Sequence, residues 1–165
     1  MIRTEPPLAA GERTMLLAFL RYQRETLLLK CDGLGPEQLR ERAVPPSEMS
    51  LLGLVRHLAR VEQMWLRAVM GDAPGTVPYW ETVNGEPGEW DVDGADPAEA
   101  LALLKDEWAA TDRAVLEAPS LDATGERRGE VFTLRWVLCH LIEEYARHNG
   151  HADLLRERID GATGE

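Results

Sequence analysis

The sequence has little of what several common classes of protein require. Only two cysteines, Cys31 and Cys139, occur in 165 residues, far apart and without a Cys-x-x-Cys pair, which argues against a disulfide framework and against a thiolate zinc site. No apolar run reaches the length of about 18 residues that a membrane span needs, and the first residues lack the apolar stretch of a signal peptide. We therefore expect a cytoplasmic protein without a membrane partner.

Basic side chains are also scarce, because 18 lysines and arginines stand against 29 aspartates and glutamates, for a net charge of −11. Nucleic acids and anionic membranes are bound through basic patches, so this balance argues against both as partners. An apolar content of 44% and a charged content of 28% are ordinary for a globular chain. The length and the absence of repeats predict one domain over residues 1–165.

Apolar residues recur at helical spacing in four segments, at about residues 10–30, 50–70, 97–116 and 134–158. Ser50, Asp96 and Thr133 are predicted N-caps of the last three. This pattern leaves Arg24, Arg56 and Arg60 for solvent, and it indicates a polar connection over 119–132. We predict an all-α fold, a four-helix bundle. The long connection between the second and third helices allows them to run parallel, in up-down-down-up topology.

That connection, residues 71–96, is rich in glycine and proline but carries Tyr79, Trp80 and Trp90. Long loops in compact domains are usually functional or disordered, and disordered segments tend to lack aromatic residues. We expect an ordered crossover that roofs a pocket, with Trp80 as a ligand-binding residue. Two other interpretations are open: the aromatic residues pack on the bundle without contacting a ligand, or the crossover is a dimer contact.

Three polar side chains fall on faces that should point inward. His148 lies within the apolar stripe of the last helix, Glu144 lies one turn earlier, and His57 lies on the inward line of the second helix. Burying such groups without partners is costly, and a divalent metal would satisfy all three. Three protein ligands leave one position open, as in catalytic zinc sites. Zinc, nickel, iron or manganese would suit these donors. A ferritin-like di-iron site is not expected, because it needs Glu-x-x-His on two helices.

Other residues of the last helix have several interpretations. His140 and His151 are alternative ligands, or groups that fix the tautomer of a ligating imidazole. Arg147 is a candidate for binding a carboxylate substrate at the mouth of the pocket. Without a metal, His57 would be a core histidine with a hydrogen-bond partner, and Glu144 would pair with Arg147, His140 or His148.

Two stretches resemble a known group of proteins. SLLGLVRHLARVEQMW at residues 50–65 and HLIEEYARHNGHADLLRE at 140–157 are similar to the DinB/YfiT-like superfamily. The similarity is greatest to an uncharacterised actinobacterial branch related to mycothiol-dependent enzymes such as maleylpyruvate isomerase. The resemblance covers nearly the whole chain. It implies an up-down-down-up bundle, often dimeric, with a metal held by His57, Glu144 and His148.

The resemblance also implies an activity. Characterised relatives use a small thiol such as mycothiol or bacillithiol, which suggests a metal-dependent S-transferase in detoxification or stress response. Zinc is the expected metal and nickel the second choice. His151 or His140 would take the thiol proton, and the partners would be a thiol and an electrophile. The isomerases carry a further C-terminal domain without counterpart in these 165 residues, so we expect S-transfer and not isomerisation. The alternatives are a non-catalytic metal- or ligand-binding protein and a hydrolase that uses metal-bound water.

Overall fold

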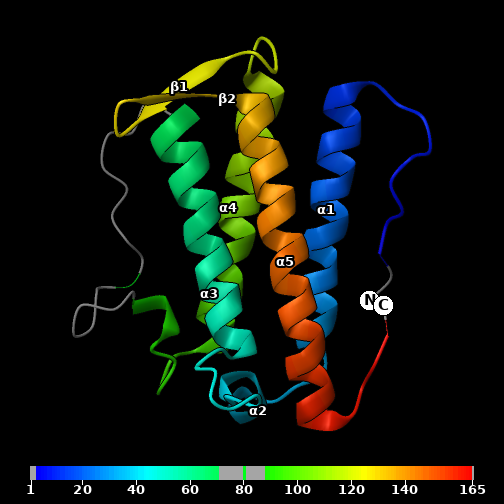
Figure 1. Cartoon of the computed structure of the whole chain (residues 1–165), viewed down its shortest axis with the longest axis vertical. Coiled ribbons are helices and arrows are strands. Elements are labelled where there is room, and N and C mark those ends of the chain that lie inside the picture. Colours follow the sequence, from blue (N-terminus) through cyan, green and yellow to red (C-terminus); the bar gives the residue numbers. More distant parts are fainter. Residues whose placement is uncertain (1–2, 71–79, 81–87, 165) are drawn as a thin grey trace.

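The computed structural model describes residues 3–70, 80 and 88–164, and for 67–70 the backbone alone. Within these residues the chain is mostly helical, with one small two-stranded sheet. The α-helices are α1 (Glu12–Cys31), α2 (Pro36–Arg40), α3 (Leu51–Glu62), α4 (Pro97–Glu117) and α5 (Leu134–Asp160). The long helices α1, α3, α4 and α5 lie side by side (Figure 1), and α1 and α5 run opposite to α3 and α4. The predicted parallel arrangement of the second and third long helices is therefore present.

The helices α3, α4 and α5 begin where short polar side chains satisfy free N–H groups of the first turn. Ser50 Oγ accepts a hydrogen bond from the Gly53 N–H at 3.1 Å. Asp96 Oδ1 accepts one from the Ala98 N–H at 2.9 Å, and Thr133 Oγ1 accepts one from the Trp136 N–H at 3.2 Å. All three predicted N-caps are confirmed.

Two segments differ from the prediction. The second long helix changes at Gln63 into a π-helix, η1 (Gln63–Met70). The predicted polar connection holds an antiparallel hairpin, β1 (Thr124–Arg127) with β2 (Glu130–Thr133). Its turn residues Arg128 and Gly129 both have positive φ. Positive φ at both central residues is what a two-residue hairpin turn of type I′ requires. The Phe132 ring packs edge-on against Trp65 of η1 at 5.2 Å, so tertiary packing holds this short hairpin. The expected all-α class is therefore correct for the helices but omits the hairpin β1–β2.

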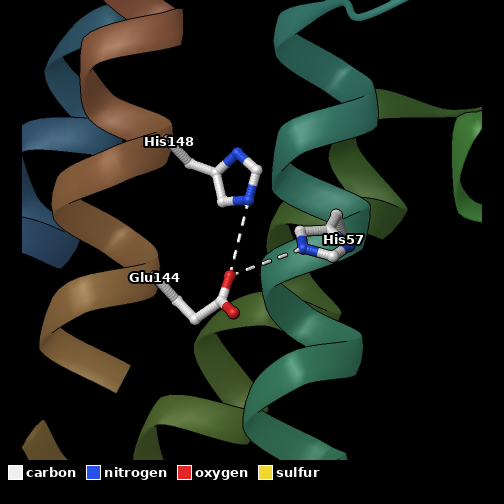
Figure 2. A group of neighbouring side chains, drawn as sticks. All are labelled: His57, Glu144 and His148. Atoms are coloured by element: carbon white, nitrogen blue, oxygen red, sulfur yellow. Dashed lines mark ion pairs between the residues drawn. The ribbon is translucent and has the colours of Figure 1, made fainter. Parts of the chain in front are cut away.

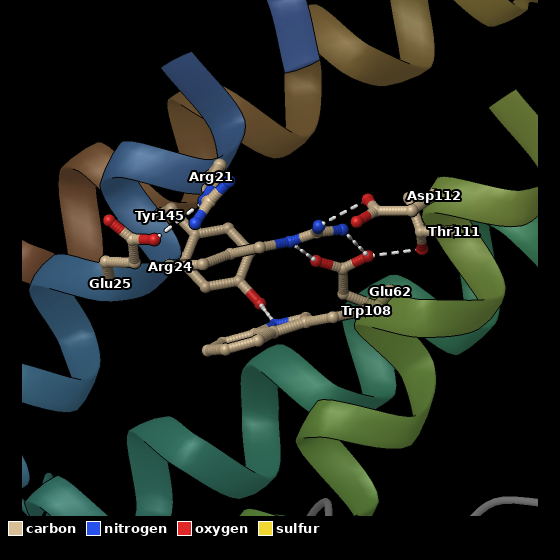
Figure 3. Close-up of polar contacts among 8 residues, drawn as sticks. All are labelled: Arg21, Arg24, Glu25, Glu62, Trp108, Thr111, Asp112 and Tyr145. Atoms are coloured by element: carbon tan, nitrogen blue, oxygen red, sulfur yellow. Dashed lines mark hydrogen bonds and ion pairs between the residues drawn. The ribbon is translucent and has the colours of Figure 1, made fainter. Parts of the chain in front are cut away.

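The core between the long helices is apolar, with a buried polar network at its centre (Figure 3). Arg24 of α1, predicted to face solvent, is only 3% exposed. It donates two hydrogen bonds of 2.8 Å to the fully buried carboxylate of Glu62 of α3. Thr111 of α4 donates to the same carboxylate at 2.5 Å. The Trp108 indole N–H donates to the Tyr145 hydroxyl of α5 at 2.7 Å. The network therefore joins α1, α3, α4 and α5. It includes Tyr145, the residue next to Glu144 in the chain.

None of the helices within the described residues is long and apolar enough to cross a membrane.

Candidate metal centre

The structure brings together the three residues that the sequence singled out (Figure 2). His57 projects from the middle of α3, and Glu144 and His148 project from consecutive turns of α5. Glu144 Oε2 lies 3.5 Å from His148 Nε2 and 3.9 Å from His57 Nε2. One atom from each residue lies within 4.8 Å of the others. The cluster spans the gap between two helices that are far apart in the sequence.

These separations suit a metal ion. Ligand bonds of ~2.0–2.1 Å in a tetrahedral arrangement place neighbouring ligand atoms about 3.3 Å apart. The 3.5 Å pair already has that spacing, and the 3.9 Å pair needs a shift of a few tenths of an ångström. The third pair, one nitrogen each of His57 and His148, lies within 4.8 Å and would have to close by at most about 1.5 Å. Two imidazole nitrogens and one carboxylate oxygen are donors that zinc, nickel, iron and manganese accept. The residues present therefore fit a divalent cation with a free coordination position.

The cluster lies at the edge of the core and not in its centre. The side chains of His57 and Glu144 are 22% and 21% exposed, and that of His148 is 11% exposed. Burial, and after it the nearby His57, His151 and Arg147, together lower the pKa of His148 from its ordinary value of 6.5 to about 4. His148 is therefore a neutral imidazole at neutral pH, which is the form that binds a metal.

His57 has a second set of contacts, on the face turned away from Glu144, that sequence reasoning did not find. Glu89 Oε1 lies 3.5 Å from His57 Nδ1, and the Trp90 ring stacks on the imidazole with centroids 5.1 Å apart. Both residues belong to a 3-10 turn, η2 (Gly88–Trp90), at the end of the crossover. Burial by itself raises the pKa of Glu89, but His57, the Glu89 backbone and Arg60 outweigh it and bring the pKa to about 2. Glu89 therefore carries its negative charge at neutral pH.

Two arginines of α3 that were expected to face solvent bind this turn instead. Arg56 is 5% exposed and donates to the backbone carbonyl of Gly88 at 3.1 Å and to that of Asp91. Arg60 Nη1 donates to both oxygens of Glu89, at 2.6 and 2.8 Å. The prediction for Arg56 and Arg60 was wrong because their partners lie about 30 residues further along the chain, beyond the reach of helical periodicity.

The other two histidines of α5 flank the cluster. His151 Nδ1 lies 3.3 Å from His148 Nδ1, on the nitrogen of His148 that is turned away from Glu144. His140 Nε2 lies 3.5 Å from Glu144 Oε1, the oxygen that His57 and His148 leave free. His140, Glu143 and Glu144 form a second group of metal-ligand type. Glu143 is half-exposed and ion-paired with Arg147 at 2.5 Å, so we favour the group that contains His57.

The two residues predicted to bind a substrate or cofactor, Trp80 and Arg147, are not members of the cluster. Arg147 is exposed, and its ion pair with Glu143 holds it on the solvent side of α5. Trp80 is half-buried, and the Arg56 guanidinium lies over its ring at 4.5 Å. Tyr79 and most of the crossover, which was expected to roof a pocket, lie outside the described residues.

The surroundings of the cluster differ toward its two ends. Toward the hairpin, Trp65, Phe132, Trp136 and His140 form a series of ring contacts with centroids 4.8–5.2 Å apart, and Trp136 is 44% exposed. Toward α2, His151 borders an apolar pocket of about 90 Å³, which is also lined by Val44, Ser47, Met49, Leu154 and Leu155. A larger hollow of about 700 Å³ lies beside α2, but none of the cluster residues lines it.

The fold and the cluster define a helical-bundle protein that presents a histidine–glutamate–histidine set of metal-ligand type between two of its helices. The family model described as mycothiol-S-transferase matches residues 15–161. The chain belongs to this mycothiol-S-transferase family, as the resemblance to the DinB/YfiT-like superfamily implied.

The solved structures include one similar chain, a conserved protein from Enterococcus faecalis. It is 17% identical, with a TM-score of 0.65 over 93% of this chain and 100% of the other, and this likeness shows the fold alone. A search of the curated proteins found no match.

Proposed function

We propose that this protein binds a divalent metal, zinc first and nickel second, and transfers a small thiol of the mycothiol or bacillithiol type to an electrophile. The observation that carries the proposal is the placement of His57, Glu144 and His148, with their donor atoms within 4.8 Å of one another. The match to the mycothiol-S-transferase family over residues 15–161 supports the thiol as co-substrate. A role in detoxification or stress response would follow from such chemistry.

In this proposal the four-helix bundle is the scaffold that holds the three ligands. Glu144 and His148 come from one helix and stay one turn apart whatever else moves. His57 comes from α3, and the buried network around Glu62 and Tyr145 keeps α3 and α5 in register. A divalent metal held here would lower the pKa of a thiol and favour its thiolate, the nucleophilic form.

The transfer forms one sulfur–carbon bond at the electrophile. The thiol loses its proton, and a leaving group, where the electrophile has one, departs with the electron pair of its bond to carbon. We assign the role of proton acceptor to His140, because its Nε2 faces Glu144 at 3.5 Å from the side opposite His57 and His148. His151 is the second choice, because its Nδ1 is already in contact with His148 at 3.3 Å.

The exposed aromatic wall next to His140 suits the apolar part of an electrophile. Trp136 stacks on His140 with an angle of 18° between the rings and is 44% exposed. A planar apolar group would gain stacking contacts and burial there. The family match does not identify the electrophile, so a panel should contain aromatic and aliphatic examples of equal reactivity.

The test compares metal content and thiol transfer in the wild type and in single alanine variants. We expect about one metal per chain in the wild type, a large loss of metal in His57→Ala and in His148→Ala, and loss of transfer in both. His140→Ala is the matched control, because it removes an imidazole that the proposal does not use as a ligand. It should keep its metal and lose transfer. Full metal content in His57→Ala and His148→Ala would refute the site.

Two other outcomes would select a different function. Metal binding without transfer to any electrophile would favour a binding or sensor protein. Cleavage of esters or amides without a thiol would favour a hydrolase that uses metal-bound water. The homodimer that the resemblance implies stays a prediction, which light scattering of the purified protein would check.

A further inference from the structure

The turn η2 at the end of the crossover is held firmly against α3, one helical turn before His57. An ideal Cβ on Gly53 would lie 3.0 Å and 3.3 Å from two atoms of the Trp90 ring. A side chain at position 53 would therefore push the indole away from the helix by a few tenths of an ångström. Arg56 holds the same turn from the side through the carbonyls of Gly88 and Asp91. The turn is thus placed on the outer face of α3 by both packing and hydrogen bonds.

Glu89 is the only carboxylate of this turn, and it is almost completely buried, at 2% exposure. A buried carboxylate needs a cation or several hydrogen bonds. Arg60 supplies the cation and contacts both oxygens at 2.6 and 2.8 Å. The carboxylate is therefore fixed, with Oε1 3.5 Å from His57 Nδ1. Among the described residues, Nδ1 has no hydrogen-bond partner of ordinary length and is buried.

The two nitrogens of His57 face opposite neighbours. Nε2 is turned to Glu144 at 3.9 Å, and Nδ1 is turned to Glu89. Because the lone-pair directions of the two ring nitrogens diverge, Glu89 does not share an ion that is bound at Nε2. An acceptor beside Nδ1 favours a proton on that nitrogen, which leaves the Nε2 lone pair free toward Glu144. Ligating histidines commonly have such a carboxylate on their other nitrogen.

Trp90 restrains the remaining freedom of the same ring. It stacks on the imidazole of His57 with an angle of 23° between the planes. The imidazole of His148 meets His57 edge-on, with centroids 4.8 Å apart. Rotation of the His57 ring about its bond to Cβ would break the stacking and move Nε2 away from Glu144. The turn therefore contacts this ring both at Nδ1, through Glu89, and across its face, through Trp90.

We propose that η2 is a positioning element for the metal centre, in which Glu89 fixes the Nδ1–H tautomer of His57 and Trp90 fixes its ring plane. This inference rests on the proposed role of His57 as a ligand. It makes the last part of the crossover, residues 88–90, a support for the site.

The first test needs no metal. Nitrogen chemical shifts of the His57 ring in the metal-free protein, assigned by their loss in His57→Ala, report which nitrogen carries the proton. We expect the Nδ1–H tautomer in the wild type and a shift toward Nε2–H in Glu89→Gln. The matched control is Glu12→Gln, which removes another carboxylate paired with an arginine, Arg135, at 2.7 Å, far from His57 in the chain. A wild-type protein with mainly the Nε2–H tautomer would overturn the proposal, whether or not the variant folds.

The second test measures zinc and cobalt(II) affinity by competition with a chelator, together with the visible spectrum of the cobalt form. We expect about 10- to 100-fold weaker binding in Glu89→Gln, the loss that removal of such outer partners causes, and an altered cobalt spectrum. Glu12→Gln should match the wild type in both. A merely structural role would lower thermal stability in Glu89→Gln but leave the dissociation constant within twofold and the spectrum unchanged, and that result would overturn the proposal. A wild type that binds no metal would overturn the proposed function. The tautomer of His57 in the metal-free protein would in that case still show whether Glu89 orients the ring.

Discussion

Removal of Arg24 gives the sharpest test of how this bundle is held together. In the folded protein, Arg24 is 3% exposed and donates two hydrogen bonds of 2.8 Å to Glu62, which is 0% exposed. Burial lowers the pKa of Arg24, but Glu62 and Asp112 more than reverse this effect, so the guanidinium stays charged. The Arg24→Met variant keeps the volume of the side chain but leaves Glu62 with hydroxyl donors alone, among them Thr111.

The magnitude follows from the burial of both partners. Breaking a buried ion pair from one side costs about 3–5 kcal/mol, because an uncompensated charge is left in the core. In a chain of this size about 1 kcal/mol lowers Tm by roughly 2–4 °C, so the expected loss is on the order of 6–20 °C. Urea unfolding followed by circular dichroism would measure the free energy of unfolding directly.

A double variant distinguishes lost pairing from lost packing. In Arg24→Met with Glu62→Met, neither charge remains, and we expect stability to recover by at least about 2 kcal/mol over the worse single variant, since apolar replacements of buried ion pairs are often neutral. Arg21→Met is the control on the same helix. Its ion pair with Glu25 is exposed and should contribute less than about 1 kcal/mol. Equal and small effects of Arg21→Met and Arg24→Met would refute the reasoning.

Three further predictions use other parts of the molecule. Zinc at 100 times its dissociation constant should stabilise the wild type by about 2.7 kcal/mol, and this gain should vanish in His148→Ala; an equal thermal shift in both would contradict the site. Because the pKa of His148 is lowered from 6.5 to about 4, the unfolded chain binds its proton first, so the metal-free protein should lose up to about 3 kcal/mol as the pH falls from about 6.5 to 4. His148→Gln should flatten that part of the profile of unfolding free energy against pH, and an unchanged slope would contradict the assignment. Cys139 is exposed, whereas Cys31 is buried and its pKa is raised to about 12, so a disulfide reagent should titrate one thiol per native chain and two after denaturation; two fast thiols in the native protein would contradict the burial of Cys31.

Local chemistry in the sequence was enough to predict the helices and two of the three proposed ligands as a pair. Ser50, Asp96 and Thr133 act as N-caps through hydrogen bonds that span only two or three residues. Glu144 and His148 lie one turn apart because the helical repeat places residues four apart on the same face. Such features depend on neighbours in the chain, and the sequence therefore determines them by itself.

Tertiary structure decided the features that join distant segments. Periodicity assigned Arg24 and Arg56 to solvent, since nothing within one or two turns of either residue marks it as buried. Their partners, Glu62 and the backbone of the turn η2, lie more than 30 residues away. The hairpin at 124–133 likewise depends on contact between Phe132 and Trp65, which the pattern of a short polar connection does not reveal.

The candidate site also has features that the sequence determined and features that only the tertiary structure determined. The sequence determined that His57, Glu144 and His148 lie on the faces of their helices that point into the bundle. Only the packing of α3 against α5 brought His57 Nε2 to 3.9 Å from Glu144, and only the return of the crossover placed Glu89 beside Nδ1. The physical reason is that helical periodicity sets the direction of a side chain, whereas the distance between two side chains on different helices is set by the packing of everything between them.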